Sequence, residues 1–426
     1  MRQILESDIL GEKIHFKRLK NGLDVYVLPK PGFYRKSAIY ATKYGSNDIS
    51  FVVPGESQVT DVPLGIAHFL EHKAFEEPEG DVFEMFSNLG ADPNASTGYD
   101  ATSYYFTTTE NFYECLDLLI GFVNRPYFTD ENVEKEKGII TQELLMYEDN
   151  AHWMVYFNLL RGLYERHPVR NDIGGTVESI KAIDKDMLYR TYNTFYHPSN
   201  MVVFAVGDID PEKMFEQVES HFKEDLKEQG KIERMTTQEP EEVFQREIRH
   251  KMPVSRPLFA IGYKDTPINK GGKELLKKII VNGIVSDMTI GSTSDLYSQL
   301  YEEGLIDGSF GGGYTGEMDY AYMVLSGETA NVDLLIERLQ DGIDDIKKKG
   351  PDKDLFLQAK RGRIGRFIRY FDYVGGLGPL FVSLYIKESN LFDYIEVLDS
   401  ITYEDVKAGL ETAFDEKRRV VSIVEP

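Results

Sequence analysis

The chain has 426 residues, of which 71 are acidic and 48 are basic, so its formal net charge is −23 at pH 7. A negative charge of this size repels phosphate backbones and anionic lipid surfaces, which argues against a nucleic-acid-binding protein. Hydrophobic residues make up 42% of the sequence, enough to bury a large core, and the length predicts about two to three domains.

Two further features of the composition bear on the cellular compartment. The single cysteine, Cys115, excludes an intrachain disulfide and fits a reducing environment. The first residues lack the apolar core of a signal peptide, and nowhere do about eighteen apolar residues follow one another. We therefore expect a cytoplasmic protein without membrane insertion.

The first elements expected along the chain are two strands and a helix. Residues 23–28 follow a turn at Asn21 and Gly22 and read as a strand, and residues 37–44 read as a second strand. A helix is expected directly after Pro63, Leu64 and Gly65.

This helix carries the only closely spaced pair of histidines in the sequence, His68 and His72, with Glu71 between them. On a helix the four-residue interval stacks both imidazoles on one face, and Glu71 falls on the same stripe. The opposite face is apolar. The segment therefore predicts an amphipathic helix that packs by its back and presents two imidazole nitrogens toward one point.

Zn²⁺ suits this geometry. It binds neutral imidazole nitrogen at about 2.0–2.1 Å, and a catalytic zinc site holds three protein ligands and keeps one position open. Glu71 stands where a general base for water would stand. The order H-x-x-E-H is the inverse of H-E-x-x-H and is typical of inverzincins. The alternative is that these are two surface histidines on an acidic helix.

The segment after the histidine helix reads as a continuing α/β layer. Residues 81–88 and 114–123 are expected to be helices, and residues 102–107 are expected to be a strand because of their β-branched and aromatic content.

A further short strand is expected between these elements. It consists of Asn94, Ala95, Ser96 and Thr97. We expect it to be an edge strand beside the metal, because its unpaired backbone groups could then accept an extended peptide as an added strand.

A third metal ligand is expected from a long helix that begins after Thr129. Glu136 and Glu143 share a face of this helix and are seven residues apart, or about 10 Å along its axis. Only one of them is therefore expected to reach the zinc. Spacing alone does not choose between them, and Glu134 and Glu148 also remain candidates.

The histidine motif and the downstream segment from Glu136 to Glu143 resemble the pitrilysin or insulinase family of zinc peptidases. Matching stretches also occur at residues 167–168, 175–180 and 196–208, so the resemblance covers nearly the whole chain. It implies that Glu143 is the third zinc ligand. It also implies that Glu136 is an acid beside the site that does not bind the metal.

The composition changes near residues 225–245, which are charged and poor in large apolar side chains. We interpret 229–245 as a linker between a zinc-bearing domain, 1–228, and a second domain, 246–426. The resemblance implies an α+β fold of two homologous α/β domains, each with a mixed or antiparallel sheet covered by helices, that enclose a cleft. The second domain is expected to lack metal ligands.

The second half departs from the family pattern. Many active members carry an arginine and, shortly after it, a tyrosine that reach the substrate, whereas Tyr301 and Asp307 stand at those positions here. We expect Tyr301 to contact substrate and a homologous subunit to supply the Arg/Tyr pair in a heterodimer, with a homodimer as the alternative. The run Gly311–Gly313 is either a turn or bulge or the family's glycine-rich stretch.

Two functions follow. In the first, the chain is a zinc endopeptidase for peptides or unfolded polypeptide segments, with zinc on His68, His72 and Glu143 and with Glu71 transferring protons. In the second, it is a non-catalytic or scaffold subunit of a heteromeric peptidase of the same family. The intact ligand set favours the endopeptidase.

Overall fold

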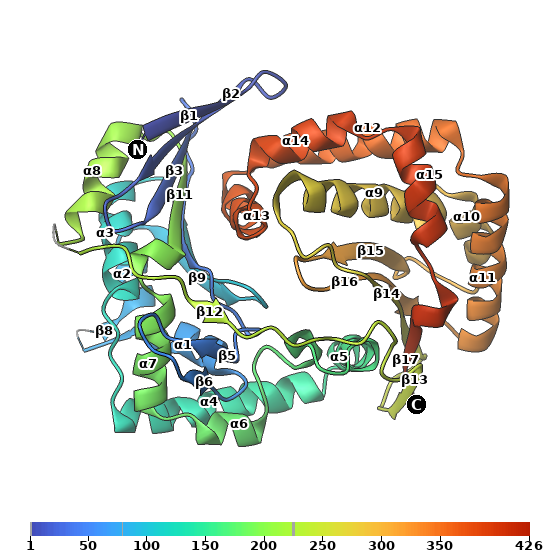
Figure 1. Cartoon of the computed structure of the whole chain (residues 1–426), viewed down its shortest axis with the longest axis horizontal. Coiled ribbons are helices and arrows are strands. Elements are labelled where there is room, and N and C mark those ends of the chain that lie inside the picture. The colour runs from blue at the N-terminus through green and yellow to red at the C-terminus, as the bar shows by residue number, and fades with distance from the viewer. Residues whose placement is uncertain (1, 79, 224–225) are drawn as a thin grey trace. The chain divides into compact units, whose positions relative to one another are not determined.

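The computed structural model describes residues 2–78, 80–223 and 226–426 (Figure 1). Helices and sheets are mixed throughout these residues, so the expected α+β class is confirmed. None of the helices among the described residues is long and apolar enough to cross a membrane. The chain divides into two compact units, each built from three segments. Unit 1 is Met1–Leu144, Asp172–Thr236 and Ile368–Ile386, and unit 2 is Leu145–Asn171, Thr237–Phe367 and Lys387–Pro426.

Unit 1 is organised on a seven-stranded mixed sheet in which only β3 and β11 pair in parallel. Its strands, from one edge to the other, are β1 (Arg2–Ser7), β2 (Glu12–Arg18), β3 (Asp24–Pro29), β11 (Met201–Gly207), β4 (Lys36–Thr42), β10 (Thr102–Thr108) and β9 (Ala91–Thr97). All four strands expected in the first half of the sequence lie in this sheet. Smaller sheets join β5 (Ser50–Val52), β6 (Val59–Asp61) and β12 (Glu233–Arg234), and β7 (Glu76–Glu77) with β8 (Gly80–Asp81).

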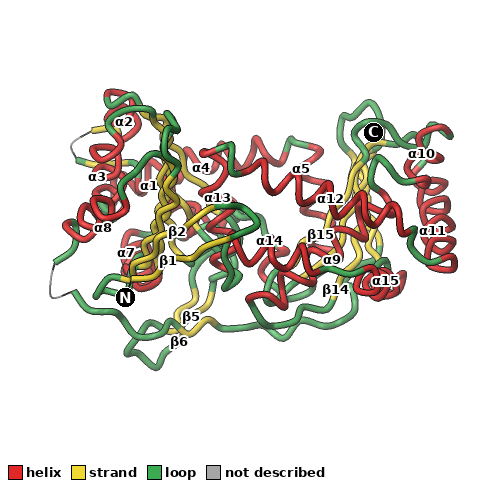
Figure 2. Tube along the Cα trace, turned by 90° about the horizontal axis from the view of Figure 1, so that it is seen from above, coloured by secondary structure: helices red, strands yellow, loops and turns green. Residues whose placement is uncertain are grey.

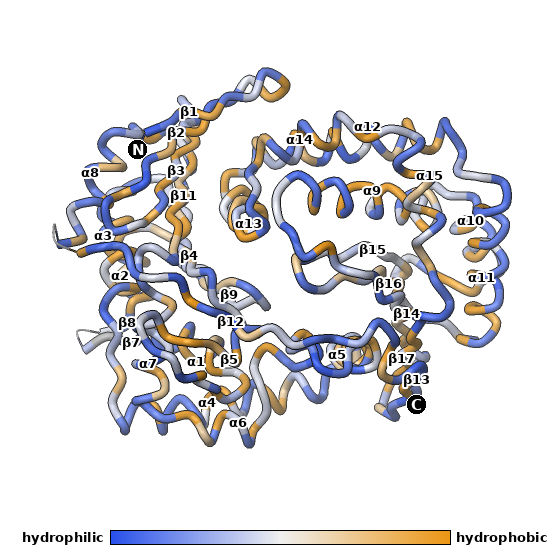
Figure 3. The backbone as a smooth tube through the Cα atoms, in the orientation of Figure 1, coloured by the Kyte–Doolittle hydropathy of each residue, from blue (hydrophilic) through white to orange (hydrophobic). Residues whose placement is uncertain are grey.

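The sheet of unit 1 is covered on both faces (Figure 2). Strand β11 is largely hydrophobic (Figure 3), and all seven of its residues are buried, as expected for a strand covered on both sides. On one face Phe204 stacks on Phe381 with ring centroids 4.3 Å apart, and Gly378 lies against Ile39. The helices of this unit are α1 (Ile66–Ala74), α2 (Val82–Asn88), α3 (Phe112–Val123), α4 (Asp130–Glu148), α6 (Val177–Ala182), α7 (Lys185–Phe195), α8 (Pro211–Ser220) and α13 (Val374–Ile386), with the last turn of α4 in unit 2.

Unit 2 has a five-stranded mixed sheet in which only β13 and β17 pair in parallel. In spatial order its strands are β13 (Glu247–Lys251), β17 (Arg419–Glu425), β14 (Leu258–Asp265), β16 (Ala321–Glu328) and β15 (Gly311–Gly316). Its helices are α5 (Ala151–Leu163), α9 (Gly272–Ile290), α10 (Asp295–Glu302), α11 (Val332–Lys349), α12 (Lys353–Tyr370), α14 (Leu391–Ser400) and α15 (Tyr403–Thr412), with the last residues of α12 in unit 1. Single 3-10 turns lie at Pro168–Arg170 and Glu416–Arg418 in unit 2, and another lies at Pro198–Asn200 in unit 1.

The compact units do not coincide with the contiguous domains expected at 1–228 and 246–426. Helix α13 buries its apolar face on the sheet of unit 1, although it comes from the second half of the sequence. Helix α5 comes from the first half and packs on β14 and β17 of unit 2, where Gly162 lies against Val420. The expected boundaries of the homologous domains, and the cleft between them, stay predictions.

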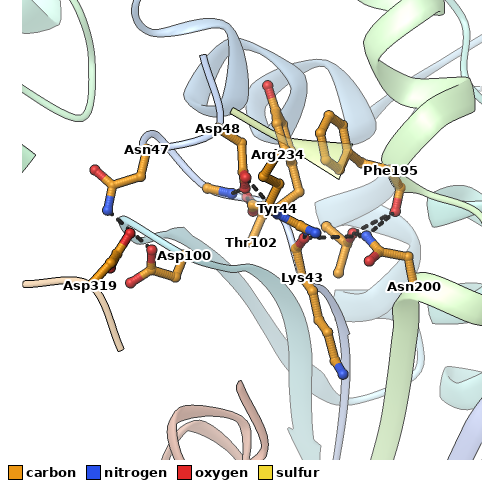
Figure 4. A network of polar contacts seen from close by, with 12 residues as sticks. Lys43, Tyr44, Asn47, Asp48, Asp100, Thr102, Phe195, Asn200, Arg234 and Asp319 are labelled. Atoms are coloured by element: carbon orange, nitrogen blue, oxygen red, sulfur yellow. Dashed lines mark hydrogen bonds and ion pairs between the residues drawn. The ribbon is translucent and has the colours of Figure 1, made fainter. Parts of the chain in front are cut away.

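The expected linker, 229–245, is likewise divided between the units. Arg234 binds Asp48 of unit 1 with Nε and Oδ1 2.7 Å apart, in a network that also includes Asn200 and Thr102 (Figure 4). Within unit 2, the buried Lys264 binds Glu239 at 2.7 Å. Each unit therefore holds one part of the segment by an ion pair.

Candidate metal centre

Helix α1 is positioned by a glycine at its N-terminus. Gly65 has a φ of 84°, in the left-handed region that favours glycine, and a Cβ there would lie 2.3 Å from the carbonyl oxygen of Gly174. The helix buries Phe69 and Leu70 in the core of unit 1. The predicted amphipathic helix is therefore present, and its other face carries the two histidines.

Three side chains of the predicted site converge in unit 1. One ligand atom each from His68, His72 and Glu143 lies within 4.8 Å of the other two. The Nε2 atoms of His68 and His72 are 3.9 Å and 3.4 Å from the Glu143 carboxylate. Two imidazole nitrogens and one carboxylate oxygen are the donor set of a catalytic zinc site, so the residues present fit Zn²⁺.

The alternative ligands on α4 lie elsewhere. Glu134 is exposed and pairs with Lys137 at 3.1 Å, and Glu148 is exposed at the end of the helix. Glu136 is buried and reaches the other side of His72, with Oε1 3.0 Å from Nδ1. When Glu136 accepts a hydrogen bond from the Nδ1–H of His72, the lone pair on Nε2 of His72 faces Glu143.

The two histidines have opposite electrostatic surroundings. Burial and the neighbouring His72 lower the pKa of His68 to about 4, so its imidazole is neutral near pH 7 and can bind a metal. For His72, burial acts to lower the pKa, but the hydrogen bond to Glu136 and the charges of Glu136, Glu143 and Glu71 outweigh it and raise the pKa. Metal binding at His72 therefore competes with a proton.

Glu71 is not part of the ligand cluster but lies beside it on α1. Burial raises the pKa of its carboxyl group, and the Thr97 hydroxyl opposes this shift by a hydrogen bond of 2.5 Å to Oε2. A carboxylate whose pKa is raised toward neutrality is better suited to accept and return a proton at neutral pH.

The strand expected beside the site is at the edge of the sheet. Strand β9 contains Asn94, Ala95, Ser96 and Thr97, pairs with β10 on one side, and ends the strand order of the sheet. The edge position is therefore confirmed, and Thr97 lies against Glu71. The role of these four residues in binding substrate stays a prediction.

The residues expected to matter in the second half belong to unit 2. Tyr301 is 55% exposed on α10, and its role in substrate binding stays a prediction. Asp307 pairs with Arg256 at 3.0 Å. The run Gly311–Gly313 lies in the edge strand β15, which excludes a simple turn.

Two contacts, Thr97 with Glu71 and Arg256 with Asp307, are not predicted by any sequence pattern. Thr97 is 26 residues from Glu71, and Arg256 is 51 residues from Asp307. The sequence identifies Thr97 only as a member of a short polar strand, and nothing in its type or spacing predicts a partner on another element. Arg256 lies in a loop without any motif.

The chain matches two family models. Residues 52–177 match the model described as Insulinase (Peptidase family M16), and residues 182–363 match the Peptidase M16 inactive domain. The chain is 41% identical over 423 residues to the Bacillus subtilis (strain 168) protein named "Uncharacterized zinc protease YmfH", covering 99% of both chains.

Solved structures agree with these matches. A protein from Alicyclobacillus acidocaldarius described as an M16-like peptidase superimposes with a TM-score of 0.94 at 37% identity, covering 99% of each chain. Pitrilysin superimposes with a TM-score of 0.76 at 16% identity, and the match covers all of this chain but 46% of pitrilysin, which shows the fold alone. From the site geometry and these matches together, the chain belongs to the pitrilysin/insulinase family of zinc peptidases, M16.

Proposed function

We propose that the chain is a zinc-dependent endopeptidase that hydrolyses peptides or unfolded polypeptide segments. One observation carries the proposal: the ligand atoms of His68, His72 and Glu143 lie within 4.8 Å of one another, with Glu71 on the same helix as the histidines. A zinc ion held there would supply a Lewis acid for a peptide carbonyl and for water.

The protein's own groups would carry the proton transfers. Glu71 accepts a proton from the attacking water and delivers it to the amine that leaves. Glu136 accepts a hydrogen bond from Nδ1 of His72 and fixes the orientation of that ring. The apolar face of α1 is buried in the core of unit 1, and this burial holds His68, Glu71 and His72 in fixed positions relative to one another.

Strand β9 would bind the substrate as an added strand. In an antiparallel pair, alternate residues direct their backbone groups to the same side. The Ala95 N–H donates to its neighbour's side chain, Asn94 Oδ1, at 2.8 Å rather than to β10. Pro93, two residues earlier, has no N–H to offer β10. The backbone groups of Ala95 therefore face the free edge, where an extended peptide can pair with them.

We expect Ala95→Pro to weaken substrate binding without breaking the sheet. The substitution removes one N–H at the free edge and costs about one hydrogen bond, so KM for an extended peptide should rise about fivefold with little change in kcat. Steady-state kinetics with Ala95→Val as the matched control, which keeps the N–H, would measure this. An unchanged KM in a folded Ala95→Pro protein would rule out strand addition at this residue.

The function itself is tested by metal analysis and peptide cleavage. The purified chain should hold about one zinc, lose hydrolysis of an unstructured peptide when a chelator removes the metal, and regain it when zinc is restored. A chain that holds zinc yet cleaves nothing, alone or with a homologous partner, would instead be a non-catalytic or scaffold subunit.

A partner subunit is part of the proposal. It is supported by Tyr301 and Asp307, which stand where the family's arginine and tyrosine are expected. A homologous subunit that carries this pair would complete the site in a heterodimer, and a homodimer is the alternative. The free, buried thiol of Cys115 supports a cytoplasmic location.

A further inference from the structure

We infer that Thr97 is a positioning residue whose hydroxyl holds the Glu71 carboxylate in place for proton transfer, so that the substrate-binding strand also aligns the general base. This inference rests on the proposed function for the role of Glu71. It assigns to the Thr97 side chain a task that is different from contact with substrate.

A hydrogen bond ties Thr97 to Glu71. The hydroxyl Oγ1 donates to Oε2 at 2.5 Å, and the backbone N–H of Thr97 also acts to lower the pKa of the Glu71 carboxyl group. An O–H donor to an ionised carboxylate forms one of the stronger hydrogen bonds in proteins. Since a carboxylate has two oxygens, the bond to Oε2 leaves Oε1 able to accept a proton.

The position of Thr97 is itself fixed by the hairpin. It is the last residue of β9, and the next residue, Gly98, donates its N–H to the carbonyl of Ala101 at 2.7 Å. Directly across the hairpin is Thr102, whose buried hydroxyl donates to the carbonyl of Tyr44 at 3.0 Å. A β-branched side chain in a strand also has few χ1 choices, so the Thr97 hydroxyl is held in direction as well as in place.

The same side of β9 serves both substrate and base. Gly98 donates to Ala101 across the hairpin, so the alternate residues Thr97 and Ala95 direct their backbone N–H groups away from β10. A peptide that pairs with Ala95 therefore lies next to the carboxylate that Thr97 holds. Thr97 thus links the strand expected to bind peptide to the expected general base.

Kinetics of hydroxyl-deleting variants test the inference. Thr97→Val keeps the shape of the side chain and the backbone N–H but removes the hydroxyl. We expect kcat to fall about tenfold to a hundredfold, because that rate factor corresponds to the free energy of a hydrogen bond to a charged group. KM should stay within about twofold, because the hydroxyl does not contact substrate, and zinc content should be unchanged. Thr97→Ser, which restores the hydroxyl, should recover most of kcat.

The matched control is Thr102→Val. It deletes a hydroxyl at the directly opposite position of the same hairpin, where the bond goes to Tyr44, so it should lower the melting temperature without lowering kcat. Equal losses of kcat in Thr97→Val and Thr102→Val would mean that the loss comes from a less stable hairpin. A raised KM with unchanged kcat in Thr97→Val would make the hydroxyl a substrate contact. Loss of zinc would make it a support of the ligand helix. Each of these results overturns the inference.

A spectroscopic measurement separates this inference from the proposed function. Visible absorption of the Co²⁺-loaded chain reports the surroundings of the metal without turnover. Thr97→Val should change the spectrum, whereas Thr97→Ser and Thr102→Val should match the wild type. If the wild type cleaves no peptide, the proposed function fails, but the spectra still decide whether Thr97 positions Glu71. Identical spectra for Thr97→Val and the wild type would refute the positioning role.

Discussion

Replacing Glu71 with glutamine should remove most of the peptide hydrolysis while leaving the metal in place. Glutamine keeps the size of the side chain and can still accept a hydrogen bond from Thr97, but it cannot take a proton from water. General acid–base catalysis contributes about 10²–10⁴-fold, so kcat should fall by that factor. Metal analysis should still find about one zinc per chain.

His68→Ala provides the contrast that makes this result meaningful. It removes one of the three clustered ligand atoms, so both zinc and activity should be lost together. Glu134→Gln is the matched control, since Glu134 is an exposed acid on α4 that pairs with Lys137 outside the cluster. If Glu71→Gln lost zinc as His68→Ala does, Glu71 would be a ligand and not a base.

The histidine helix could be predicted because its geometry is local. The interval between His68 and His72 fixes their relative direction once the segment is helical, and the apolar residues on the other face indicate which side is buried. Spacing could not choose between Glu136 and Glu143, because both lie on the same face of α4. The choice depends on where α4 lies against α1, and there Glu143 meets both histidines while Glu136 reaches the far nitrogen of His72.

Long-range packing was the part that the sequence could not predict. The expected helices at 81–88 and 114–123 are present, the second beginning two residues early at Phe112, because periodicity is a local property. In contrast, the apolar face of α13 does not reveal that it will cover a sheet formed by residues more than 160 positions earlier in the chain. The pairing of Thr97 with Glu71 is hidden for the same reason.

The isolated chain should be a slow peptidase that a homologous subunit accelerates. An oxyanion needs donors besides the metal, and the loss of one donor costs about 10²–10³ in rate. The family resemblance places Asp307 at the tyrosine position. The hydrogen bonds from Ser309, followed by the charge of Arg256, lower the pKa of Asp307, so it remains a carboxylate and has no proton to donate. A subunit with the Arg/Tyr pair should therefore raise kcat about 10²–10³-fold.

Repairing the pair within the chain gives a second test of the same idea. Tyr301 is exposed and Asp307 lies in the loop after α10, so Tyr301→Arg with Asp307→Tyr should fold and should raise kcat without any partner. Arg256→Gln serves as a control, because it frees Asp307 without restoring a donor. If the wild-type chain alone already works near the usual median of about 10 s⁻¹, and neither a partner nor the double variant raises kcat, the second subunit has no catalytic role. A rate that rises only with the chain's own concentration would point to the homodimer, in which the missing arginine is not replaced.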